Sequence, residues 1–138
     1  MIFDAKQVAE WTKQFDPTRT VDHASGWHDQ GVGKTALRSL HIYYTPLRVP
    51  RDPRPVVLSE FGGYSMQHTA QELLWDTDCV FDISSSLMFM EKGQAERYIR
   101  NYGAERCAYG TDYPLWDPVR EVEAFQKLNL TDAQFEQI

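Results

Sequence analysis

Apolar residues along the chain fall into two patterns, which predict two kinds of element. Short, nearly continuous apolar runs are typical of strands that are buried on both faces of a sheet. Longer segments with apolar residues three and four positions apart are typical of amphipathic helices. We predict strands over residues 20–24, 40–44, 55–60, 79–83 and 106–109. We predict helices over residues 4–15, 69–75, 93–102 and 118–128, and a last one that begins after Thr131.

Residues at the ends of these helices support their boundaries. Asp4 is a predicted cap of the first helix, which ends before Pro17, and Thr131 is a predicted cap of the last. Gly103 closes the helix over 93–102. Strands that alternate with helices indicate βα units around a parallel sheet. The predicted fold class is therefore α/β: a partial (β/α) TIM barrel with about five parallel strands, because 138 residues are too few for a complete barrel of roughly 250.

Two helix faces are predicted to pack on this sheet. Val8, Trp11 and Phe15 form a stripe on the first helix, and residues 98, 99 and 102 form another on the helix over 93–102. Between the helices and strands, the glycine-rich residues 25–36 are predicted to form a long loop, and the proline-rich residues 46–55 an extended connection.

Composition narrows the choice of partners and location. Fourteen basic and twenty acidic side chains give a net charge of −6, which argues against nucleic acid and membrane surfaces as partners. No apolar run is long enough to span a membrane, and the first residues lack the pattern of a signal peptide, so a cytoplasmic location is expected. Cys79 and Cys107 lie in apolar strands, and we predict two buried thiols rather than a disulfide.

Two acids stand at the ends of predicted strands, where parallel α/β folds place their reactive groups. Glu60 ends the strand over 55–60, and Asp112 follows the strand over 106–109. A carboxylate in such a place can act as a nucleophile or a base. The alternative is that each acid only accepts hydrogen bonds from the loop beside it. If both acids point into one pocket, they form a paired-carboxylate site; if they lie far apart, neither has a partner.

Residues 58–64, LSEFGGY, resemble the nucleophile strand of glycoside hydrolase family 2, the family of β-galactosidases and β-glucuronidases. The resemblance extends through residues 15–19, 22–31 and 40–44 and covers about residues 1–66. It implies that Glu60 is the nucleophile of a retaining glycosidase, that Tyr43 is its hydrogen-bond partner, and that a carbohydrate is the substrate. The residues that it places near the sugar are His23, Trp27, His28 and His41.

Retaining glycosidases need a second carboxylic acid roughly 5 Å from the nucleophile. The family's acid lies in an Asn-Glu motif before the helix with which this chain begins, and here only residues 1–4 precede that helix. Asp4 is better explained as a helix cap than as a substitute. The resemblance thus implies a glycosidase site without its general acid.

Residues 62–138 resemble the C-terminal part of the amidohydrolase-related metal-dependent hydrolases. The motifs that carry this resemblance are FDISSS at 81–86, GTDYP at 110–114 and LWDP at 115–118. It implies that Asp112 binds a divalent metal such as zinc or takes a proton from metal-bound water. The family's H-x-H pair is absent, so Asp112 alone would hold a metal weakly, and a structural role for it is an equal alternative.

The two resemblances meet at residues 62–66, which divides the chain into segments 1–66 and 67–138 of one continuous α/β unit. We therefore predict a hydrolase-derived barrel fragment with weak activity or none, through Glu60 or Asp112 and with no certain cofactor. The alternative is a non-catalytic half-barrel that associates with its own copies through open sheet edges.

Overall fold

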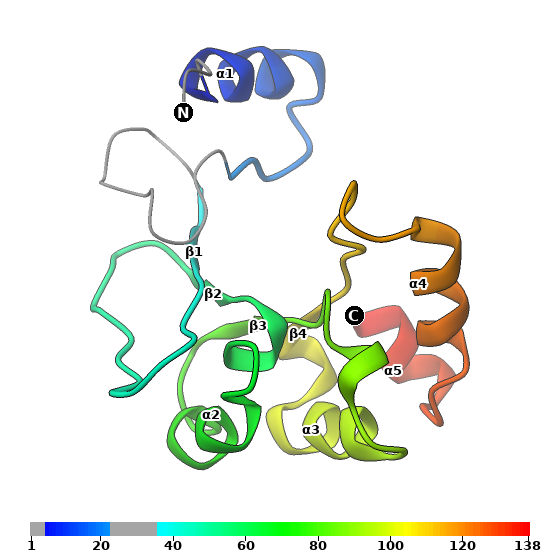
Figure 1. The fold of residues 1–138 in the computed structure, drawn as a ribbon. Coiled ribbons are helices and arrows are strands. Elements are labelled where there is room, and N and C mark those ends of the chain that lie inside the picture. The colour runs from blue at the N-terminus through cyan, green and yellow to red at the C-terminus, as the bar shows by residue number, and fades with distance from the viewer. Residues whose placement is uncertain (1–4, 23–35) are drawn as a thin grey trace.

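The computed structural model describes residues 5–22 and 36–138, which contain one parallel four-stranded sheet with helices packed around it (Figure 1). The strand order β1-β2-β3-β4 follows the chain, so each strand pairs with its neighbour in sequence. The strands are β1 (Arg38–Leu40), β2 (Val56–Leu58), β3 (Val80–Asp82) and β4 (Cys107–Ala108). The predicted α/β class and the parallel, part-barrel arrangement are confirmed.

Five α-helices accompany the sheet in the described residues: α1 (Ala5–Phe15), α2 (Gln67–Leu74), α3 (Gln94–Tyr102), α4 (Pro118–Gln126) and α5 (Asp132–Gln137). Thr131 forms a capping box with Gln134 at the start of α5, as its sequence position predicts. Gly103, at φ 95°, ends α3, and its amide donates to the carbonyl of Ile99 at 2.9 Å. The predicted cap Asp4 lies outside the described residues.

The observed strand β1 corrects the predicted strand over 40–44. Its pairing with β2 runs from Arg38 opposite Val56 to Leu40 opposite Leu58. The amide of Ser59 still donates to the carbonyl of Leu40 at 3.0 Å, and the chain after Ser59 then turns into a short 3₁₀ helix, Glu60–Gly62. Among the described residues, no strand pairing continues beyond Leu40, so His41 and Tyr43 lie past the end of β1.

The predicted fifth strand, over residues 20–24, is wrong for the part that the structure describes. Residues 20–22 have no strand conformation. The amide of Ala36 donates to the carbonyl of Val21 at 3.4 Å, and the hydroxyl of Ser39 donates to the carboxylate of Asp22. These bonds hold the segment beside β1 without the repeated backbone pairing that defines a strand.

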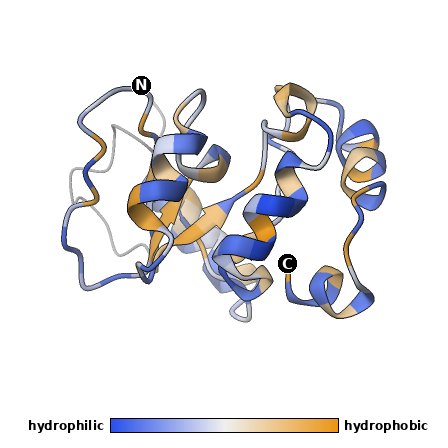
Figure 2. Ribbon diagram, turned by 90° about the horizontal axis from the view of Figure 1, so that it is seen from below, coloured by the Kyte–Doolittle hydropathy of each residue, from blue (hydrophilic) through white to orange (hydrophobic). Residues whose placement is uncertain are grey.

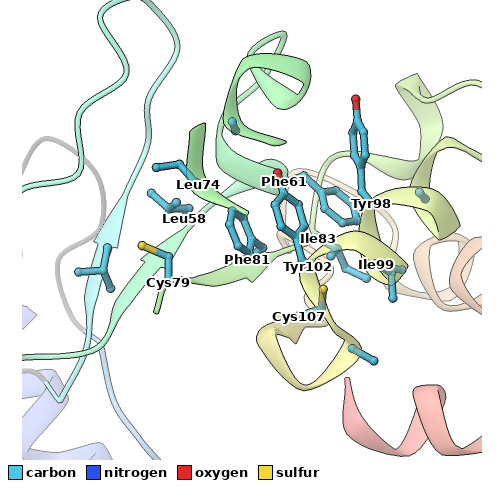
Figure 3. Close-up of a cluster of buried hydrophobic side chains, with 14 residues drawn as sticks. Leu58, Phe61, Leu74, Cys79, Phe81, Ile83, Tyr98, Ile99, Tyr102 and Cys107 are labelled. Carbon is cyan, nitrogen blue, oxygen red and sulfur yellow. The ribbon is translucent and has the colours of Figure 1, made fainter. Parts of the chain in front are cut away.

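The core lies between the sheet and helices α2 and α3. Hydrophobic colour is concentrated on the strands, and the helices carry much of the hydrophilic colour (Figure 2). Leu58, Phe61, Phe81 and Ile99 are completely shielded from solvent, and the ring of Phe81 stacks on Tyr102 with 3.7 Å between ring centroids (Figure 3). Burial of a large apolar side chain contributes roughly 1.5–3 kcal/mol, so this cluster is the main source of stability.

The two predicted packing faces have different outcomes. Residues 98, 99 and 102 of α3 are buried in the core, as predicted. On α1, by contrast, Val8, Trp11 and Phe15 are 53%, 60% and 93% exposed, so the prediction that they pack on the sheet is wrong. Figure 1 shows α1 away from the strands, because the described part of residues 20–24 adds no strand against which it could pack.

Both cysteines are buried free thiols, as predicted. Burial raises the pKa of Cys107 to about 12, which leaves its thiol protonated and unreactive. Within the described residues, no helix has both the length and the apolar character needed to cross a bilayer.

Candidate functional site

Side chains from all four strand ends line a pocket of about 290 Å³. The carboxyl ends of parallel strands lie at one edge of the sheet, and this is where such folds bind ligands. The lining residues are Ser39, His41, Ser59, Glu60, Asp82, Ser84, Gly110 and Asp112. Glu60 and Asp112, the two acids predicted at strand ends, therefore share one pocket.

Glu60 follows β2 in the left-handed region, at φ 57°. Its Oε1 accepts a hydrogen bond from the hydroxyl of Tyr43 at 3.2 Å. Burial raises the pKa of Glu60, the bond from Tyr43 partly offsets that rise, and the negative charge of Asp112 adds a smaller increase. Glu60 therefore keeps its proton to a higher pH than an exposed glutamate does.

Gly63 fixes the distance between Glu60 and the segment that carries His41 and Tyr43. Gly63 has φ 124°, and a Cβ atom built on it would lie 1.7 Å from the carbonyl oxygen of Ile42. Only glycine permits this approach of two backbones. Its consequence is that Tyr43 reaches Glu60 although β1 ended three residues before it.

Asp112 is held by a chain of side-chain hydrogen bonds. Its Oδ2 accepts from the hydroxyl of Ser85 at 2.5 Å, and the oxygen of Ser85 accepts from the indole Nε1 of Trp116 at 2.7 Å. Asp112 thus has a defined position, although the residue as a whole is exposed to solvent.

Asp82 is a third carboxylate in the pocket, and the strand-end analysis did not single it out as a site residue. It accepts bonds from the amide of Ser84 at 3.0 Å and from its hydroxyl at 2.5 Å. Burial raises the pKa of Asp82, and the charge of Asp112 adds to the rise. Its position as the last residue of β3, at the carboxyl end of a parallel strand, is the sequence signal that could have found it.

The backbone is strained around the pocket. Glu60, Ser85 and Asp112 follow three adjacent strands, and their φ angles are 57°, 51° and 53°. Residues other than glycine rarely adopt this region, although aspartate does so more readily than most. Such strain costs about 1–3 kcal/mol per residue and is concentrated at functional sites. The strained residues include both predicted acids.

Tyr43 and His41 form a second hydrogen-bonded array beside Glu60. The Nδ1 atom of His41 lies 2.7 Å from the hydroxyl of Tyr43, and its Nε2 lies 3.1 Å from the hydroxyl of Ser59. Burial and the charge of Glu60 raise the pKa of Tyr43 to about 12, so its hydroxyl keeps its proton. The structure therefore has the bond between Tyr43 and Glu60 that the glycosidase resemblance implied, while the catalytic roles of both stay predictions.

Several predicted residues cannot be placed. His23, Trp27 and His28, the predicted sugar contacts, lie outside the described residues. Of the four predicted sugar contacts, His41 is the one that the structure describes, and it lines the pocket.

The pocket offers donors of the types that a divalent metal accepts, namely carboxylates and an imidazole. In residues 5–22 and 36–138, however, no three such side chains are placed to hold one ion. Within that part of the chain, Asp112 does not belong to a group of three ligands of the kind that a stable metal site needs, and its predicted metal role stays a prediction.

Comparisons with known proteins leave the family open. No family model matches the sequence, and no curated protein matches it. Among solved structures, the chain is similar to a dihydroxybenzoic acid decarboxylase from Polaromonas sp. JS666 with bound manganese and the inhibitor 2-nitroresorcinol. The TM-score is 0.48 at 16% identity, over 62% of this chain and 31% of that one. This chain thus spans about a third of that structure, and so distant a likeness supports no conclusion about function.

Proposed function

We propose that the pocket hydrolyses a small, hydroxyl-rich substrate such as a glycoside, with Glu60 and Asp112 as its pair of carboxylates. The presence of both strand-end acids in one pocket is the observation that carries this proposal. Hydrolysis of a glycoside by two carboxylates needs one that is protonated and one that is ionised. In this proposal Asp112, from the C-terminal half of the chain, supplies the second carboxylate.

We assign proton transfer to Glu60 and the ionised role to Asp112. Burial raises the pKa of Glu60, which suits a group that gives a proton to the leaving oxygen near neutral pH. Asp112 is more exposed than Glu60, and the hydrogen bond that it accepts from Ser85 holds its carboxyl group in place at the pocket. In this assignment Glu60 is the general acid, rather than the nucleophile that the family resemblance implied.

The size and lining of the pocket support a small polar substrate. A volume of about 290 Å³ is near the lower end of the range of ligand pockets, which is roughly 300–1,000 Å³. Three serines and three carboxylates line it, and these groups can bond to several hydroxyls at once. A single sugar ring fits this description better than an extended apolar ligand does.

Leaving-group dependence tests the role of Glu60. In Glu60→Gln, the rate of hydrolysis of a phenyl glycoside should fall at least about 100-fold, because its leaving oxygen needs a proton. Hydrolysis of the dinitrophenyl glycoside should fall much less, since that leaving group departs as the anion. Equal losses for both substrates, together with a covalent adduct at Glu60 from a fluorosugar probe, would show that Glu60 is the nucleophile instead.

A second candidate is a self-associating, non-catalytic unit, and the exposed face of α1 favours it. Val8, Trp11 and Phe15 present an apolar stripe to solvent, and apolar stripes of this kind mark interaction surfaces. We infer that a second copy of the chain covers this stripe.

Light scattering over a range of protein concentrations tests this association. The chain should form dimers or larger species, and the double substitution Trp11→Lys and Phe15→Lys should shift it to monomer. Leu73→Lys is the matched control, because Leu73 is an exposed apolar residue on α2, 56% exposed. A monomeric parent chain at all concentrations would rule this candidate out.

A further inference from the structure

Ser59 and His41 stand in the geometry of a nucleophile and its base. Their Oγ and Nε2 atoms lie 3.1 Å apart, and both residues line the pocket at the end of β2. Ser59 is the last residue before the 3₁₀ helix Glu60–Gly62, and its surface is 8% exposed. A serine at a sharp turn after a parallel strand presents its hydroxyl at the edge of the sheet where substrates bind.

The direction of each hydrogen bond follows from the groups present. The hydroxyl of Tyr43 donates to Oε1 of Glu60, and this oxygen can accept whether the carboxyl group is ionised or carries its proton on Oε2. The oxygen of Tyr43 then accepts from His41, which places the imidazole proton on Nδ1. In the neutral ring, Nε2 therefore carries a lone pair directed at the hydroxyl of Ser59. This is the tautomer that a general base needs.

In its ionised form, Glu60 also favours the charge that forms on His41 when it takes a proton. His41 and Glu60 attract each other electrostatically, and this attraction lowers the pKa of Glu60. Tyr43 thus links the base to a carboxylate, as the third member of a catalytic triad orients the histidine. The link runs through one phenolic hydroxyl instead of a direct bond.

From this array we propose that Ser59 is a nucleophile, activated by His41, that accepts short acyl groups from activated esters. The proposal does not rest on acid–base catalysis by Glu60 and Asp112. The hydroxyl oxygen of Ser59 attacks the ester carbonyl while its proton passes to Nε2 of His41. The carbon–oxygen bond to the leaving group then breaks, the imidazolium returns its proton to that oxygen, and water later releases the acid.

A fluorophosphonate probe tests this assignment on the purified full chain. The oxygen of Ser59 should displace fluoride from phosphorus, with the hydroxyl proton passing to His41, and leave a stable phosphonate ester. Peptide mass spectrometry should locate the adduct on Ser59. The denatured chain should not react, because the array exists only in the folded protein.

Substitutions distinguish labelling that depends on the array of Ser59, His41 and Tyr43 from the nonspecific reactivity of serine side chains. Ser59→Ala should abolish the adduct, and His41→Ala should lower the rate of labelling about 100-fold, since general-base assistance is lost. Tyr43→Phe should lower the rate by a smaller factor, because it removes the group that fixes the tautomer of His41. Ser65→Ala is the matched control: Ser65 is an exposed serine six residues after Ser59 that does not line the pocket, and its loss should leave labelling unchanged.

Labelling at another serine, an unchanged rate in His41→Ala, or no adduct on the folded chain would each overturn the assignment. Circular dichroism of every variant distinguishes loss of the array from loss of the fold. Glycoside hydrolysis by the Glu60 and Asp112 pair has a separate readout, so failure of either proposal leaves the other standing.

Discussion

Phe81→Ala should lower the free energy of unfolding by about 3–5 kcal/mol. Phe81 lies on β3, between β2 and β4, and none of its surface reaches solvent. The mutation removes the stacking on Tyr102 and the contact with the Arg106 guanidinium, which lies 5.4 Å from the ring centroid. A cavity remains there, because strands on both sides limit how far the core can collapse.

A loss of this size is a large part of the 5–15 kcal/mol that stabilises a typical domain. Thermal denaturation followed by circular dichroism should therefore show a melting temperature lower by at least roughly 10 °C. Phe15→Ala is the matched control, since Phe15 is 93% exposed and its removal should change the stability by no more than about 0.5 kcal/mol. Equal melting temperatures for the two variants would show that the core does not lie around β3.

Asp112→Asn should lower glycoside hydrolysis by about 100-fold to 10,000-fold, the range for loss of a catalytic carboxylate. The substitution keeps the shape of the side chain, and the new amide oxygen can still accept the bond from Ser85. It removes the negative charge, and with it the group that would activate water or stabilise the cationic transition state. Stability should change little.

Steady-state kinetics on a phenyl glycoside measures this effect. Glu123→Gln is the control, because Glu123 is an exposed acid on α4 whose replacement removes the same charge outside the pocket. The control should keep its turnover within about twofold. A similar small effect for Asp112→Asn would mean that Asp112 is a structural acid, the alternative left open by its sequence position.

Local sequence patterns predicted much of the fold, but not the contacts that decide where β1 ends and whether α1 packs on the sheet. The helix positions followed from apolar spacing and from end residues such as Gly103 and Thr131. Strand β1 ends at Leu40 because its partner β2 ends at Leu58. The apolar pattern of each segment alone does not show where this pairing stops. The exposed face of Trp11 and Phe15 shows the same limit, because an apolar stripe predicts that a helix has a partner but not whether the chain supplies it.

The sequence likewise predicted part of the candidate site and not the rest. Position at a strand end identified Glu60 and Asp112, since the parallel topology brings such ends together. The two acids line one pocket because β2 and β4 lie on either side of β3, and the sequence alone did not establish this strand order. The contact between Ser59 and His41 required the close backbone approach at Gly63 and could not be read from the spacing of the residues.

The central claim is that Glu60 and Asp112 interact in one pocket, and an NMR titration of the Glu60 side-chain carboxyl tests it most directly. Asp112 contributes to the raised pKa of Glu60 through repulsion between two negative charges. Removal of one charge should therefore lower the pKa of Glu60 in Asp112→Asn relative to the parent chain. The same substitution at Glu123 should leave it unchanged. A pKa of Glu60 that stays the same or rises in Asp112→Asn would contradict the paired-carboxylate site.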